Sequence, residues 1–431
     1  MFVELRIKNF LSFKEETTIS FEASKDGFKE NSILVTMPDG TRLSRIAIIY
    51  GANASGKSNL LDAFDYLFWF WKRKTDDQDT PTGVESFALD RETPSQPTKF
   101  DLKLYVNDKK YVYQLLLTPK AVLSEKLFVY NSNQPSLLLH RELVDGNTAL
   151  KFNPSLIKTP AAVKDELTAK CLNNMSLFAA RNAVNCNLGE IDDVRDWMIH
   201  HTLPVIDSGQ KMFEYAEKNM FENPDTKKHL LDFCHNIGLN INDMTVEKDF
   251  MPLTPEMIQL IQASGRFTEE NINKLNKDPK LQTGFKTLFS MSVNNERGKE
   301  MYTLPKSNQS EGTLRSIGIE TALYIAEQND KLLPIDEIET SMHPLLLKYM
   351  IQSFLNTPSR SQLIITTHYD PLFSAVDEYL RKDSFWLINK RDDGNSVLFP
   401  LISKNGVNKM RSLQRAYLNN KLGGLPQIEG L

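Results

Sequence analysis

The chain has 431 residues, of which 41% are hydrophobic, and this is enough for one large core and for two or three domains of ordinary size. Its 51 basic and 55 acidic residues nearly cancel, so no overall positive field marks it as a nucleic-acid binder. The three cysteines, Cys171, Cys186 and Cys234, have neither zinc nor redox spacing and argue against a disulfide framework. Because neither a leader peptide nor an apolar run of about 18 residues is present, we expect a cytoplasmic protein without a membrane segment.

The first part of the chain reads as strands around one helix. Residues 3–21 alternate around a turn, which predicts two short paired strands, and residues 45–50 form an apolar run typical of a buried central strand. A glycine-rich loop follows, and apolar residues then recur at helical spacing over 60–71. Residues 99–143 alternate in short runs between turns, which predicts an antiparallel meander.

The middle of the chain is charged and favours helices, which we expect around residues 163–171, 191–201, 211–221 and 226–237. After it, helices and strands alternate as in a parallel α/β sheet, at residues 313–328, 331–335, 344–355 and 362–366. A last hairpin is expected from strands at residues 385–389 and 397–402.

Residues Gly51 to Ser58 match the phosphate-binding loop GxxxxGK[ST] completely and lie between a predicted strand and a predicted helix. Glycine lets backbone N–H groups point at phosphates, Lys57 adds a positive charge near the β and γ oxygens, and Ser58 can bind Mg²⁺. We therefore predict ATP and Mg²⁺ as ligands, with nucleotide contacts from Gly51, Asn53, Ala54, Ser55, Gly56, Lys57, Ser58 and Asn59.

Two later strands end in polar residues that suit phosphate chemistry. Asp336 and Glu337 follow an apolar strand, and we expect the first to hold the Mg²⁺ shell and the second to orient the attacking water. Pro334 is unusual in such a strand. His368 ends the next strand, at the edge where open α/β sheets bind ligands, and could contact the γ-phosphate or the water. Alone, such an acid pair is more often a solvated turn and such a histidine a strand end, but the upstream phosphate loop favours catalysis.

Ser310 to Gly312 precede the helix at 313–328 and offer a hydroxyl, free backbone amides and a positive helix end to an anion. Taken alone, this is the pattern of an ordinary helix N-cap.

In chain order, these four motifs resemble the Walker A, signature, Walker B and switch-histidine motifs of ABC ATPases. The opening run at residues 5–13, the loop at 53–59 and the run at 336–344 resemble the RecF/SMC/OLD-like branch, and within it the RloA/AbiL-like ATPases of bacterial anti-phage loci. The resemblance covers residues 1–130 and 300–431, whereas little in the middle of the chain matches it.

The resemblance implies an α/β fold, that of an ABC-type P-loop ATPase, to which the residue patterns add an antiparallel β subdomain and a mainly helical insertion. Its domains would be a first lobe at 1–160 with the phosphate loop and the meander, a helical insertion or lid at 161–299, and a second lobe at 300–431.

The resemblance also implies a head-to-tail homodimer, or a higher homo-oligomer, in which each ATP is held by the loop of one subunit and by Ser310 and Gly312 of the other. Two departures bear on turnover more than on binding: Glu311 replaces the first signature glycine, and His343 stands where many ABC proteins have an interface aspartate. The glutamine of the Mg²⁺ shell has no assigned position, since Gln114 falls in a predicted strand.

The function expected from this resemblance is a defence ATPase that senses infection, through DNA or a phage protein, and controls a separately encoded effector. The stretch after His368 is too short for the nuclease domain of OLD-type relatives, so a nuclease would be such a partner. The alternatives are a RecF-like repair ATPase that binds DNA, and an ATP-binding scaffold with little turnover.

Overall fold

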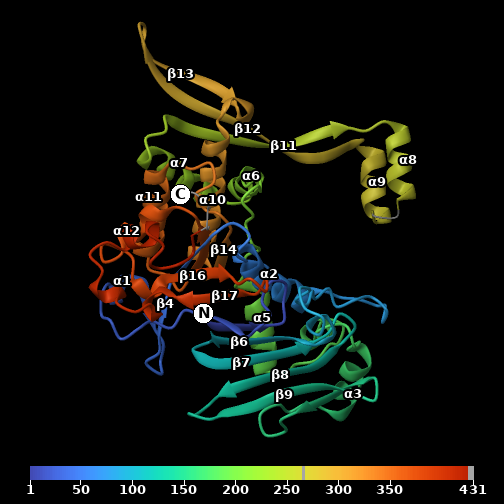
Figure 1. The fold of residues 1–431 in the computed structure, drawn as a ribbon. Coiled ribbons are helices and arrows are strands. Elements are labelled where there is room, and N and C mark those ends of the chain that lie inside the picture. The colour runs from blue at the N-terminus through green and yellow to red at the C-terminus, as the bar shows by residue number, and fades with distance from the viewer. Residues whose placement is uncertain (265–266, 426–431) are drawn as a thin grey trace. The chain divides into compact units, whose positions relative to one another are not determined.

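The structure, a computed structural model, describes residues 1–264 and 267–425 and divides into two compact units. Unit 1 contains residues 1–208, 325–340 and those from 347 onward, and unit 2 contains residues 209–324 and 341–346. Both units contain helices and strands (Figure 1). The three-part domain division at residues 160 and 299 remains a prediction, and the two compact units are divided at other residues.

In the described part of unit 1, a central sheet contains five strands in the order β14-β15-β5-β16-β17. Their bounds are Leu332–Ile335 (β14), Gln362–Thr367 (β15), Ile46–Gly51 (β5), Phe385–Lys390 (β16) and Ser396–Pro400 (β17). The first four run parallel and β17 is antiparallel to β16. Because β5, β14 and β15 are buried along their whole length, they read as continuous apolar runs. The carboxyl ends of the parallel strands meet at one edge of this sheet.

A second sheet of unit 1 is antiparallel and, among the described residues, contains seven strands in the order β10-β9-β8-β7-β6-β1-β2. Their bounds are Asn147–Phe152, Pro135–Val144, Val122–Tyr130, Lys109–Leu117, Thr98–Val106, Phe2–Lys8 and Thr17–Ser20. A small pair consists of β3 (Leu34–Thr36) and β4 (Arg42–Ser44). The predicted strand pair near the start of the chain and the predicted meander are both confirmed.

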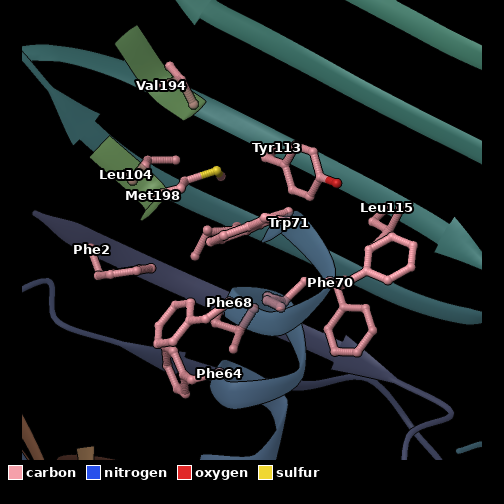
Figure 2. Close-up of a cluster of buried hydrophobic side chains, with 14 of the residues drawn as sticks. Phe2, Phe64, Phe68, Phe70, Trp71, Leu104, Tyr113, Leu115, Val194 and Met198 are labelled. Carbon is pink, nitrogen blue, oxygen red and sulfur yellow. The ribbon is translucent and has the colours of Figure 1, made fainter. Parts of the chain in front are cut away.

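Helix α2 (Lys57–Lys72) packs its apolar side chains against the antiparallel sheet and forms the main core of unit 1 (Figure 2). Trp71 is fully buried and meets Tyr113 of β7 edge to face, with the ring centroids 5.7 Å apart. Phe64 meets Phe2 of β1 in the same way, at 5.9 Å. The helix that follows the phosphate loop is therefore held along its length by large aromatic contacts.

The other helices of unit 1 confirm the expected pattern after the meander and after the central strands. Their bounds are Glu30–Ile33 (α1), Ala161–Lys170 (α3), Leu177–Arg181 (α4), Glu190–His200 (α5), Pro344–Asn356 (α11, with its first turn in unit 2) and Leu413–Leu418 (α12). Val194 and Met198 of α5 are fully buried and join the core around α2 (Figure 2).

Unit 2 combines helices with a long antiparallel sheet. The helices are Phe213–Glu222 (α6), Pro224–Asn236 (α7), Pro255–Ala263 (α8), Glu269–Lys277 (α9) and Glu311–Gln328 (α10, which ends in unit 1). The sheet consists of Ile241–Pro252 (β11), Lys280–Asn295 (β12) and Gly298–Pro305 (β13). The expected helices at 211–221 and 226–237 are confirmed, whereas the sheet corrects the expectation that this part of the chain is mainly helical.

The strands of the unit 2 sheet were not predicted from the sequence, for a physical reason. Most residues of β11, β12 and β13 are exposed or only half-buried, so the strands lack the regular alternation of buried and exposed side chains that marks a strand in a sequence. The ladder of backbone hydrogen bonds, rather than a buried apolar face, holds them together.

The predicted fold class is confirmed, because a mainly parallel α/β sheet follows the phosphate loop and an antiparallel β subdomain accompanies it. Over residues 1–264 and 267–425, no helix is long and apolar enough to cross a membrane.

Candidate functional site

The phosphate loop occupies the turn between β5 and α2. Gly56 has a φ of 107°, a left-handed backbone conformation that favours glycine, and α2 begins at the next residue. The first N–H groups of α2 have no partner within the helix and are available to an anion. Asn53, Ala54 and Ser58 are exposed along the loop, and Asn59 is half-buried on the first turn of α2.

Two serines from distant parts of the chain hold the phosphate loop in place. The Ser396 hydroxyl, at the start of β17, donates to the Ser55 carbonyl oxygen at 2.6 Å and lies 2.8 Å from the Ser12 hydroxyl. The Ser396 backbone N–H donates to the Ser12 carbonyl at 2.8 Å. A Cβ atom on Gly56 would collide with both hydroxyl groups, so packing also requires glycine there. Ser12 and Ser396 were not among the site residues predicted from the sequence.

Lys57 is buried, and its ammonium group lies inside the site. The Nζ atom donates to the Gly51 carbonyl at 3.0 Å and to the Ala52 carbonyl at 3.2 Å, and it lies 2.9 Å from His368 Nε2. Burial lowers the pKa of Lys57, while the charges of Glu337, Asp336 and Glu339 raise it. Because all three hydrogen-bond partners are uncharged acceptors, a phosphate oxygen would be a stronger partner for this cation.

Ser58 and Asp336 meet where the resemblance expects a metal ion. The Ser58 hydroxyl donates to Asp336 Oδ2 at 2.8 Å, and the Thr366 hydroxyl donates to Asp336 Oδ1 at 2.5 Å. A hydroxyl and a carboxylate are hard oxygen ligands of the type that Mg²⁺ binds beside nucleotide phosphates. The residues present therefore fit a magnesium ion shared with ATP.

Glu337 and His368 lie next to each other at the ends of β14 and β15. Their Oε1 and Nε2 atoms are 3.7 Å apart, and the Glu337 N–H donates to the Thr366 hydroxyl at 2.8 Å. Burial and the Lys57 charge lower the pKa of His368, against the opposing effect of nearby carboxylates. Since an ammonium group can only donate, Nε2 accepts from Lys57 and the ring is neutral with its proton on Nδ1.

Pro334 does not disturb the strand that carries the acid pair. Residues 202–206 run parallel to β14, where Leu203 N–H donates to the Leu332 carbonyl at 2.9 Å and Ile206 N–H to the Pro334 carbonyl at 3.0 Å. The spacing of these bonds leaves one extra residue opposite Pro334, so the missing N–H of the proline faces a bulge. The Asp336 N–H then donates to the Ile206 carbonyl at 2.8 Å.

Further acids surround this edge of the sheet. Desolvation, followed by the charges of Asp207 and Asp336, raises the pKa of the Asp62 carboxyl group on α2 to about 6. The accumulated negative charge favours a cation beside Asp336. Gln114, the glutamine considered for the Mg²⁺ shell, lies on β7 of the antiparallel sheet, where it pairs with Asp101 and Lys126.

Ser310 and Gly312 belong to unit 2, unlike the other predicted site residues. The Ser310 hydroxyl accepts from the Thr313 N–H at 3.1 Å and caps the start of α10. A Cβ atom on Gly312 would lie 2.5 Å from the Ser341 carbonyl oxygen, so this position requires glycine. His343 Nδ1 accepts from the Leu345 N–H at 3.2 Å at the start of α11. These contacts describe a helix N-terminus whose serine is already used as a cap.

Unit 1 thus brings together the phosphate loop, Asp336, Glu337 and His368, and adds Thr366, Ser12 and Ser396. A threonine at the end of the strand next to the acid pair was a signal for Thr366, because parallel neighbours place their last residues side by side. The sequence offers no comparable signal for Ser12 and Ser396.

Comparisons with known proteins bear on this site. The family model described as "AAA domain, putative AbiEii toxin, Type IV TA system" matches residues 46–160 and 259–374, more than half of the chain. These two segments include the phosphate loop, Ser310, Asp336 and His368. No curated protein shows a significant match to the chain.

Three solved structures of SMC heads are similar to the chain at low identity. The SMC head domain from Thermotoga maritima is 13% identical, with 93% of this chain and 98% of that chain covered and a TM-score of 0.41. An SMC head bound to the C-terminal winged-helix domain of ScpA is 13% identical, with 96% and 99% covered and a TM-score of 0.43. An SMC head with an extended coiled coil, bound to the C-terminal domain of ScpA derived from Pyrococcus furiosus, is 15% identical, with 97% and 98% covered and a TM-score of 0.36.

Proposed function

The chain belongs to the family described as AAA domain, putative AbiEii toxin, Type IV TA system, and from this membership we propose that it binds Mg·ATP and hydrolyses it to ADP and phosphate. One observation carries the proposal: Lys57, Asp336, Glu337 and His368 converge at the carboxyl edge of one parallel sheet. Each side chain has the chemistry that its step needs. Lys57 comes from the start of α2, Asp336 and Glu337 follow β14, and His368 follows β15.

The residues divide the work of phosphoryl transfer. Lys57 exchanges its loop carbonyls for phosphate oxygens, and the N-terminus of α2 adds backbone donors. Glu337 orients the attacking water and accepts its proton, while the neighbouring His368 contacts the water or the γ-phosphate. Mg²⁺, held by Ser58 and Asp336, would neutralise charge on the phosphate oxygens.

Two substitutions test the ATPase. Glu337→Gln keeps the size of the side chain but cannot accept the proton, so turnover should fall by roughly 10²-fold or more while ATP binding persists. Lys57→Ala should lose ATP binding itself, measured by isothermal titration calorimetry. Glu92→Ala, an exposed acid outside the site, serves as the control. Equal turnover of wild type and Glu337→Gln would contradict the catalytic assignment.

The finer proposal is a head-to-tail homodimer with two composite ATP sites. It is supported by the resemblance to ABC ATPases and by the α10 N-terminus at Ser310, whose first backbone N–H groups could bind a phosphate. ATP would join the phosphate loop of one subunit to Ser310 of the other. The capped Ser310 hydroxyl would then exchange its Thr313 partner for a phosphate oxygen.

Mixing two inactive variants distinguishes shared sites from separate ones. Lys57→Ala loses its own loop but can still supply Ser310, whereas Ser310→Arg keeps its loop but blocks the site of its partner. A mixed dimer therefore has one intact composite site, and we expect mixing to restore ATPase activity to about a quarter of wild type for random pairing. Mixtures that remain inactive would contradict the shared site.

The biological role proposed is defence against infection, with the ATP-dependent dimer controlling a separately encoded effector. The family description, which names a putative AbiEii toxin and a Type IV TA system, and the resemblance to anti-phage ATPases support this role. DNA or a phage protein would be the trigger. A change in cell growth and in phage plating should require both the neighbouring gene and the wild-type protein. The same change should be absent when the Lys57→Ala variant replaces the wild type. Full protection by Lys57→Ala would contradict ATP control.

A further inference from the structure

Glu339 lies in the turn that follows the acid pair, and nothing in the proposed hydrolysis uses it. Glu337 adopts a φ of 45°, and the Thr340 N–H donates back to the Glu337 carbonyl at 3.0 Å, which reverses the chain after β14. The reversal brings Glu339 to the end of β15. There, Glu339 Oε1 accepts the backbone N–H of His368 at 2.5 Å.

This contact fixes one side of the His368 backbone, and further contacts fix the other. The Tyr369 N–H donates to the Thr367 hydroxyl at 2.9 Å, and the buried Tyr50 hydroxyl donates to the Tyr369 carbonyl at 2.7 Å. With its peptide planes held on both sides, His368 has little freedom beyond its own side-chain torsions. The imidazole is thereby directed toward Lys57 and Glu337.

A simple turn cap would not need a carboxylate. A glutamine, which has the same length and an acceptor oxygen, could accept the same N–H without bringing a charge. Glu339 Oε2 is buried and, among the described residues, has no hydrogen-bond partner, which costs free energy for an ionised group. The full negative charge near His368 therefore points to a role for this residue in the site and not only in the turn.

The charged groups around the imidazole have opposite effects on its pKa. Lys57 approaches from α2, and Asp336, Glu337 and Glu339 approach from the end of β14 and the turn after it. Burial and the Lys57 charge lower the pKa of His368. Three carboxylates raise it, and Glu339 has the largest effect among them. Glu339 thus acts on His368 in two separable ways, through a hydrogen bond to its backbone and through charge.

We propose that Glu339 is a positioning residue, whose hydrogen bond to the His368 backbone holds the imidazole between Lys57 and Glu337. The hydrogen bond itself does not depend on ATP, but its catalytic consequence rests on the proposed ATPase. Glu339→Gln keeps an acceptor oxygen and removes the charge, whereas Glu339→Ala removes both. The two variants therefore separate position from charge.

Histidine NMR on the full chain tests the positioning without any hydrolysis. His368 is assigned from the spectrum of His368→Asn and titrated in wild type and both Glu339 variants. In Glu339→Gln the ring stays in place without the carboxylate, so its pKa should fall below that of wild type. In Glu339→Ala the ring is released toward water, so its pKa should rise toward the ordinary value near 6.5. Equal downward shifts in both variants, or no shift in either, would overturn the positioning role.

Steady-state ATPase kinetics test the consequence. Glu339→Ala should lower kcat by roughly 10²-fold with KM for ATP within about three-fold, and Glu339→Gln should keep kcat within about three-fold of wild type. Thermal unfolding of each variant checks folding, with Glu92→Ala as the matched control. Equal kcat loss in both variants would overturn the inference. Opposite NMR shifts with an inactive wild type would instead overturn the ATPase and leave the positioning intact.

Discussion

The central sheet of unit 1 and the long sheet of unit 2 differ in how far their side chains are buried. In the central sheet of unit 1, β14 and β15 are buried along their entire length, and polar residues appear only where the strands end. In the sheet of unit 2, β13 is exposed almost throughout and carries apolar residues such as Met301 at 57% exposure. The candidate site residues lie at the ends of buried strands, where a rigid apolar support fixes the position of each terminal side chain.

The largest contrast should appear in stability. Trp71 is fully buried under the antiparallel sheet, and Trp71→Ala should lower the free energy of unfolding by about 4 kcal/mol through lost burial and a cavity. Urea unfolding followed by circular dichroism measures this loss. A loss below about 1 kcal/mol would mean that α2 is not anchored by this contact.

A smaller but more specific effect is expected at Thr366. Its hydroxyl joins Asp336 Oδ1 to the Glu337 N–H, so Thr366→Val keeps the shape of the side chain while releasing both acids. We expect kcat to fall by roughly 10²-fold with little change in KM for ATP. Thr245→Val, on exposed β11 in unit 2, provides the matched control. Unchanged kcat in Thr366→Val would show that the acids are positioned without this hydroxyl.

The serine contact behind the phosphate loop should affect binding more than turnover. Ser396→Ala removes the donor to the Ser55 carbonyl, so the affinity for ATP should fall by about ten-fold, which corresponds to about 1.4 kcal/mol. Calorimetric titration with ATP measures the change. Ser403→Ala, where an exposed hydroxyl bonds only the nearby Pro400 carbonyl, is the control. Identical affinities for both variants would remove Ser396 from the site.

The smallest effect belongs to the sheet of unit 2. Met301→Ser changes an exposed side chain on β13 and should alter the free energy of unfolding by no more than about 0.5 kcal/mol. The same urea titration used for Trp71→Ala gives this value. A loss comparable with that of Trp71→Ala would show that the exposed apolar residues of this sheet are covered in solution.

Sequence patterns were most informative where burial imposes a regular spacing of apolar residues. The strand before Gly51, the helix after it and the alternation that carries Asp336 and His368 were all predicted, because buried strands and amphipathic helices leave clear periods. The long strands β11 and β12 were missed because both of their faces are largely exposed. Pro334 seemed out of place only because the bulged segment beside β14 cannot be read from local sequence.

The phosphate loop can be recognised from the amino-acid sequence alone, since all of its donors lie within eight consecutive residues and the backbone geometry of Gly56 is a local property. The same holds for the two acids and the histidine that end buried strands. Three contacts became visible only in the folded chain: Thr366 joins the acids, Ser12 and Ser396 hold the loop, and Glu339 holds His368. These contacts connect residues that are far apart in the chain, and they arise from strand order and packing, which no local pattern encodes.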